Sequence, residues 1–137
     1  MNTIIEGCNS AWPRLDFESW AKTSETIHLW TQIVGKIRLR LMPWQNHSWH
    51  STLYISSRGF TTGSMPYKNG ILEIEFDFEE HCLTISSTFQ KDVNFSLNGL
   101  SVAEFYHRIF KELKNLGVEV SIHARPNELA DNPPFAE

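Results

Sequence analysis

Residues 35–50 read GKIRLRLMPWQNHSWH, and this stretch decides the predicted fold. Its first half alternates between cationic and aliphatic side chains. The cations are Lys36, Arg38 and Arg40, and the aliphatic residues are Ile37, Leu39 and Leu41. A period of two predicts a β-strand over 36–42 with one apolar and one basic face, which Pro43 would end.

The second half of this stretch concentrates polar and aromatic side chains. Trp44, Asn46, His47, Trp49 and His50 follow one another within a few positions. A plain connecting loop does not need such residues, so the stretch is the first candidate for a functional site. No complete catalytic signature accompanies it, and no nucleophile elbow surrounds the nearby serines.

Two helices flank the predicted strands. Apolar residues recur at helical spacing over 17–34, after Asp16 as a capping residue, and Gly35 suits a left-handed stop. Ser101 and Glu104 form a capping box that opens a second helix over 102–116, and Gly117 follows it.

Alternating patterns predict further strands over 48–56, 71–78, 82–87, 93–97 and 118–122, with a short extra strand near 60–62. The order α-β-β-β-β-β-α-β indicates an α+β fold with two main helices and a mostly antiparallel sheet of roughly five to seven strands. We expect a single domain over 1–137, with an extended arm at 1–15 and an irregular, proline-rich tail at 124–137.

Composition excludes some classes of partner. The net charge of −4 disfavours nucleic acid, which binds basic surfaces. The chain has no apolar run long enough for a membrane helix and no signal-peptide pattern at its start, so we expect a cytoplasmic protein. Cys8 and Cys82 match no metal-binding spacing, and a reduced pair is the simpler expectation.

The predicted strands place many polar side chains on one face of the sheet. They are Lys36, Arg38, Arg40, His50, Thr52, Tyr54, Glu73, Glu75, Asp77, Glu119 and His123. One alternative is a solvated face with cross-strand ion pairs. The other is that a helix, a loop or the tail covers part of this face and creates a polar cavity for an anionic or strongly hydrogen-bonding molecule.

A metal site is a weaker alternative. His47 and His50 would point to opposite faces of an extended segment, so His28 or Glu128 would have to complete a ligand set. The position of His28 fits a surface or core histidine of the first helix equally well, and a structural role for these imidazoles is favoured over a metal site.

Several motifs resemble a family of small, mainly bacterial single-domain proteins that is catalogued as a domain of unknown function. They are Trp12-Pro13, the HxWxQ pattern at 28–32, GKxR at 35–38, NHxWH at 46–50, RGxTT at 58–62 and the closing Pro134-Phe135. The resemblance implies no activity, but it groups the polar members of these motifs, with Asp77 and His81, in one compact unit. The chain departs from the pattern at Ser48, where relatives usually carry a second Trp, and it stops at Glu137 where relatives often continue.

The leading hypothesis is a small-molecule binding domain, which could also be an enzyme that uses histidine acid–base chemistry. The candidate catalytic residues are His28, His47 and His50. The candidate ligand-binding residues are Trp30, Gln32, Lys36, Arg38, Asn46, Trp49, Arg58 and Thr61, with Trp44 as a further wall of the pocket. The alternatives are a protein-interaction module, with a homodimer as one form, and a metalloenzyme using His47, His50 and Glu128. The sequence identifies no cofactor.

Overall fold

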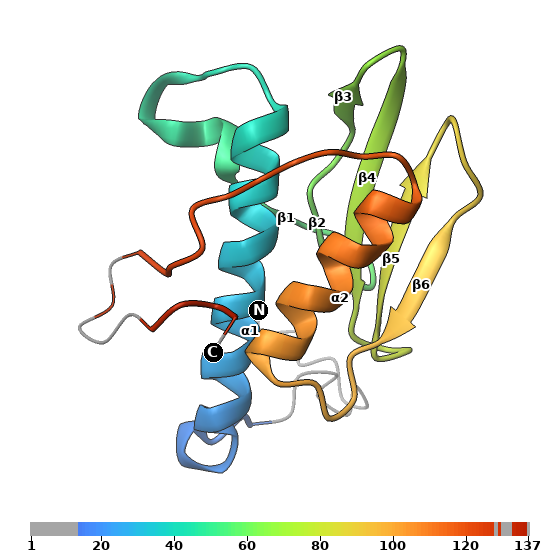
Figure 1. Cartoon of the computed structure of the whole chain (residues 1–137). Coiled ribbons are helices and arrows are strands. Elements are labelled where there is room, and N and C mark those ends of the chain that lie inside the picture. Colours follow the sequence, from blue (N-terminus) through green and yellow to red (C-terminus); the bar gives the residue numbers. More distant parts are fainter. Residues whose placement is uncertain (1–13, 128, 130–132, 137) are drawn as a thin grey trace, which may run out of the picture.

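The computed structural model describes residues 14–127, 129 and 133–136. It contains two long helices, α1 (Phe17–Leu41) and α2 (Val102–Asn115), and a short 3-10 segment, η1 (Asn46–Ser51). Figure 1 shows α1 and α2 side by side on one face of a sheet, while the segment after α2 crosses over α1 and then runs along it. The predicted α+β class is confirmed.

The sheet has six antiparallel strands. These are β1 (Tyr54–Ile55), β2 (Gly59–Thr61), β3 (Met65–Tyr67), β4 (Gly70–Asp77), β5 (Cys82–Ser87) and β6 (Val93–Ser96). The order is β1-β2-β4-β5-β6. Strands β2 and β3 lie along the same edge of β4, with β2 paired to the C-terminal end of β4 and β3 paired to its N-terminal end. The long strand β4 is therefore the centre on which the others assemble.

The core lies between the sheet and the two helices. The alternating apolar residues of β4 and β5 are fully buried, as are Ile33 and Ile37 of α1 and Phe105 and Ile109 of α2. Phe105 stacks between Trp30 and Phe76, with ring centroids 5.1 and 5.9 Å away. One apolar face of the sheet thus meets one apolar stripe of each helix, as the class requires.

The prediction of a strand over 36–42 is wrong, because α1 continues through this segment to Leu41. The apolar stripe at 30, 33, 34, 37 and 41 keeps helical spacing, and Leu39 is exposed although Ile37 is buried. Gly35 does not end the helix but lies buried within it. Lys36, Arg38 and Arg40 consequently belong to a helix and not to the polar face of the sheet.

Three other predicted boundaries also change. The strand expected over 48–56 is η1 followed by the two-residue β1, and the strand expected over 118–122 is an irregular segment. That segment does not join the sheet as a strand. It is bonded to a side chain of β3, since the backbone N–H of Glu119 donates to the Tyr67 hydroxyl at 2.8 Å. Strand β3 was not predicted, because Pro66 interrupts its short pattern. Strands β2, β4, β5, β6 and the capped helix α2 match the predicted segments closely.

Arg38 connects α1 to the segments on either side of the β1–β2 hairpin. The residue is only 5% exposed, and its Nε donates to the carbonyl oxygen of Thr62 at 2.8 Å. Nη1 donates to the carbonyl oxygen of Trp49 at 3.0 Å, and the guanidinium lies over the Tyr54 ring at 5.4 Å. No described carboxylate pairs with it. Backbone carbonyls and an aromatic face therefore compensate the buried charge.

Replacing Arg38 with Met should destabilise the fold strongly. The variant leaves the Thr62 and Trp49 carbonyls without their charged donor, and we expect a loss of about 3 kcal/mol in the free energy of unfolding, measured by urea denaturation. Arg40→Met is the control, because Arg40 is exposed and donates one hydrogen bond to Ser121. Equal losses in the two variants would contradict the role assigned to Arg38.

Candidate functional site

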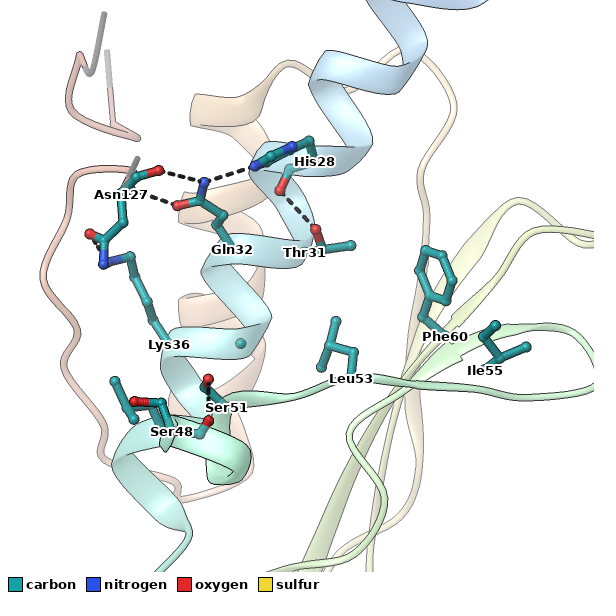
Figure 2. Close-up of a pocket in the computed structure, with 12 residues that line it drawn as sticks. His28, Thr31, Gln32, Lys36, Ser48, Ser51, Leu53, Ile55, Phe60 and Asn127 are labelled. Carbon is teal, nitrogen blue, oxygen red and sulfur yellow. Dashed lines mark hydrogen bonds between the residues drawn. The ribbon is translucent and has the colours of Figure 1, made fainter. Parts of the chain in front are cut away.

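A groove of about 680 Å³ runs along α1, and we call it the α1 groove. Its floor is the exposed side of α1 from His28 to Leu39. Figure 2 shows Asn127 of the tail on one side of this floor and the segment from Leu53 to Phe60 on the other, with Ser48 and Ser51 at one end. Three separate parts of the chain thus build one site.

The polar side of the α1 groove comes from residues spaced by four on one face of the helix. Such spacing places His28, Gln32 and Lys36 above one another. Gln32 Oε1 accepts from the backbone N–H of Asn127 at 2.8 Å, and Gln32 Nε2 donates to the Asn127 carbonyl at 3.1 Å. Lys36 Nζ donates to Asn127 Oδ1 at 2.9 Å. These side chains form a connected row against the tail (Figure 2).

The row also fixes the tautomer of His28. Gln32 Nε2 lies 3.0 Å from His28 Nε2. An amide nitrogen can only donate, so the imidazole nitrogen must accept in this arrangement. The ring proton of His28 is then on Nδ1. Gln32 therefore links the imidazole to the tail through its own amide.

Lys36 is the only lysine or arginine that lines the α1 groove in the described part of the chain. Partial burial lowers the pKa of the Lys36 ammonium from its usual value. No described carboxylate forms an ion pair with it, and its hydrogen-bond acceptor is the neutral amide of Asn127. Among the described residues, the groove therefore holds a partly desolvated cation without a counter-charge.

The other side of the groove is apolar. Leu39, Leu53, Ile55 and Phe60 line it, and Figure 2 shows Leu53 and Phe60 facing α1 across the floor. Gly35 lets the chain approach closely here, since a Cβ at this position would lie 3.2 Å from the Ser51 carbonyl oxygen. A ligand with a charged or amide end and an apolar body would match this division.

The η1 segment keeps its predicted histidines out of the α1 groove. His50 is 4% exposed, and its Nδ1 accepts from the backbone N–H of Gln45 at 3.1 Å. His47 is exposed and takes a left-handed conformation with φ of 56°. Asn46 begins η1, and Trp49 is exposed beside it. None of these four lines the groove, although Ser48 and Ser51 of the same segment do.

The remaining predicted residues lie elsewhere. Arg58 pairs with Asp77, with Glu79 at 3.2 Å and with Glu80 at 3.4 Å, so acidic residues already neutralise it. The Thr61 hydroxyl donates to Glu73 at 2.6 Å on the polar face of the sheet.

Two further members of the predicted set are core residues. Trp30 stacks in the core, and its buried Nε1 has no described partner. Arg38 is the buried connector described above, so neither it nor Arg58 is positioned to hold a ligand in the α1 groove.

A metal site finds no support in the arrangement of side chains. Among residues 14–127, 129 and 133–136, no three histidine, cysteine, aspartate or glutamate side chains gather closely enough to hold an ion. Glu128, the third ligand proposed from sequence, lies outside the described residues.

Sequence reasoning missed Asn127, Thr31, Ser48 and Ser51 as members of the groove. A signal existed for Thr31, which is one residue from Gln32 on the same helix. Asn127 carried none, because it reaches the groove from a position 95 residues beyond Gln32 and through an irregular tail. Only the path of the chain after α2 brings it there.

Comparison with known families supports the resemblance seen in the motifs. Residues 12–137 match the family of unknown function DUF5996. The chain belongs to this family. No curated protein and no solved structure shows significant similarity to the chain. No helix in the described part of this DUF5996 member is both long and apolar enough to cross a membrane.

The acidic cluster around Arg58 predicts a specific pH dependence. The hydrogen bond from Arg58 lowers the pKa of Asp77, with backbone N–H donors adding to the effect. A carboxyl whose pKa is depressed by folding stabilises the fold above its unfolded-state pKa, and this contribution is lost as pH falls through the lower folded-state value. Thermal unfolding followed from neutral to strongly acidic pH should therefore show a smaller acid-induced loss for Asp77→Asn than for the wild type.

Asp92→Asn provides the matched control for this measurement. Asp92 is exposed and makes no described ion pair, so its substitution should leave the pH profile unchanged. Identical profiles for the Asp77 variant and the wild type would show that the Arg58 pairs contribute nothing measurable.

Proposed function

We propose that this protein binds a small anionic or strongly hydrogen-bonding molecule in the α1 groove, with Lys36 as the charged anchor. The observation that carries the proposal is the position of Lys36, which lines the α1 groove and has no described carboxylate partner. The volume of about 680 Å³ is typical of small-molecule sites.

The electrostatics of the groove support an anion more than a neutral molecule. Burial lowers the pKa of Lys36, so desolvation disfavours its charged form. An anion bound beside the ammonium would restore that form, and bonds between two charged groups are roughly twice as strong as neutral ones. Binding should consequently weaken as pH rises through the pKa of Lys36.

An acid–base role, if the family has a catalytic activity, falls to His28 within this proposal. Of the three histidines suggested by the sequence, only His28 lines the groove, and Gln32 orients its ring. His47 and His50 belong to η1 and lie outside the lining. Proton transfer to a bound ligand would therefore involve the imidazole that shares a helix face with Lys36.

The anchor can be tested with acetate, succinate and inorganic phosphate as probes. In ¹H–¹⁵N spectra we expect at least one of them to shift the backbone amides of α1 from 28 to 39 and of 48–53. Lys36→Gln should weaken that binding by about tenfold or more, because it removes a charge-assisted hydrogen bond. Lys36→Arg should retain part of it.

Lys111→Gln is the matched control, because it removes the same charge from an exposed position of α2. Its spectra should respond to the probes as the wild type does. If no probe shifts the groove amides, or if the shifts survive in Lys36→Gln, the proposal fails.

Self-association is a second candidate function, favoured by one specific observation. Large apolar side chains are exposed close together in sequence around η1 and β1. Trp44 is 73%, Trp49 59% and Ile55 86% exposed, and we call these three residues the η1–β1 patch. Exposed aromatic side chains of this kind are enriched in protein interfaces. Strand β1 also lies at an edge of the sheet, where its outer backbone groups could pair with a second copy.

Light scattering over a range of concentrations tests this candidate. If the η1–β1 patch forms a homodimer, the measured mass should rise toward twice that of the monomer as concentration increases. The double variant Trp44→Ser, Trp49→Ser should keep the monomeric mass. Phe17→Ser removes a similarly exposed aromatic residue at the far end of α1 and should not change the association. A monomeric wild type at all concentrations excludes the homodimer.

A further inference from the structure

Asn127 is held in the α1 groove by three hydrogen bonds to side chains of α1. Its backbone N–H and C=O both bond the Gln32 carboxamide, at 2.8 and 3.1 Å. Its side-chain oxygen accepts from Lys36 Nζ at 2.9 Å. Figure 2 shows these bonds joining one tail residue to two successive turns of α1. The groove thus already binds one amino-acid residue, which belongs to its own chain.

The chemistry of the three bonds describes what this position recognises. A carboxamide that donates to a C=O and accepts from an N–H of the same residue reads the backbone of that residue. An ammonium placed at the side-chain oxygen prefers a carboxylate to the neutral amide it now meets. Aspartate, which has the same shape as asparagine and carries a charge, would satisfy Lys36 better than Asn127 does and would offer Gln32 the same backbone groups.

We propose that the polar side of the α1 groove recognises an acylated acidic amino-acid unit, and that Asn127 is a tethered, uncharged occupant of the same position. The recognised unit has a backbone N–H and C=O for Gln32 and a side-chain carboxylate for Lys36. A free N-acyl amino acid and an acidic residue within a peptide share this chemistry. The inference rests on the proposed function and names its ligand class.

The described contacts that anchor the tail before and after Asn127 do not involve Asn127 itself. Upstream, Arg40 Nε donates to the Ser121 carbonyl at 3.1 Å, and the backbone N–H of Phe135 donates to the Ala124 carbonyl at 2.9 Å. Phe135 is buried and stacks on Tyr106 at 6.2 Å. Asn127 itself is exposed. The three described hydrogen bonds that its displacement would break are those to Gln32 and Lys36, and none of them belongs to these anchors.

The opposite wall offers room for the neighbour of the recognised residue. Leu53 and Phe60 line the apolar side of the groove, across the floor from Gln32 and Lys36 (Figure 2). An acyl group or an apolar side chain next to the acidic unit would lie against this wall. The groove would then use both of its chemically different sides.

Two substitutions of Asn127 with opposite effects test the inference in the full chain. The probe is N-acetyl-L-aspartate amide, titrated by ¹H–¹⁵N spectroscopy. Asn127→Ala removes the competing side chain from Lys36 and should tighten probe binding by about threefold or more. Asn127→Asp gives Lys36 a tethered carboxylate and should weaken binding by about tenfold, the difference between a charged and a neutral hydrogen bond.

The control variants are Asn94→Ala and Asn94→Asp, which repeat the same chemical changes on the exposed surface of β6. Neither should change probe affinity. N-acetyl-L-asparagine amide should bind the wild type about tenfold more weakly than the aspartate probe does. A capped tetrapeptide with a central Asp separates the two sources of ligand, since tighter binding of the peptide indicates a peptide partner and equal binding indicates a free N-acyl amino acid.

The outcomes separate this inference from the proposed function. If succinate or phosphate binds in a Lys36-dependent way, while the Asn127 variants bind the aspartate probe as the wild type does, the inference is overturned and anion binding stands. Equal affinities for the aspartate and asparagine probes would also overturn it. If no anion shifts the groove amides in the wild type or in Asn127→Ala, both fail.

Discussion

The buried guanidinium of Arg38 is the constraint on which the site depends. It reaches from α1 to the carbonyl oxygens of Trp49 and Thr62, which lie before and after the β1–β2 hairpin. The bond to Thr62 is buried and the bond to Trp49 is partly buried, and together they hold the segment from η1 to β2 against α1. The apolar wall of the α1 groove is part of that segment. Removing the cation would therefore loosen one wall of the groove as well as the core.

The fold could largely be predicted from the sequence, because strands β4, β5 and β6 alternate with period two and α2 carries a complete capping box at Ser101 and Glu104. The segment at 36–42 could not, because alternating cations and aliphatic residues fit a strand as well as they fit a helix that buries Ile37 and Arg38 and half-buries Leu41. Gly35 reinforced the error, since a glycine after a helical stretch usually marks its end. In this protein the glycine lies within the helix, where its lack of a side chain lets the Ser51 carbonyl approach closely.

The candidate site was predictable to the extent that it lies on α1. His28, Gln32 and Lys36 were all among the expected residues. Because residues 36–42 were predicted to be a strand, Lys36 was assigned to a different element from the other two. Arg58 and the histidines of η1 were grouped with them because they are close in sequence. Their actual neighbours, such as the acidic residues around Arg58, come from strand pairing that spacing alone does not reveal.

The α1 helix presents core residues on one side and groove residues on the other, and both sets follow the same 3.6-residue period. Inserting or deleting a single residue between His28 and Lys36 would rotate everything beyond it by about 100°. Ile37 and Arg38 would leave the interior at the same time as Lys36 leaves the groove. This stretch of α1 should therefore tolerate substitutions at exposed positions but no change of length, whereas the irregular connection after α2 has no such phase to preserve.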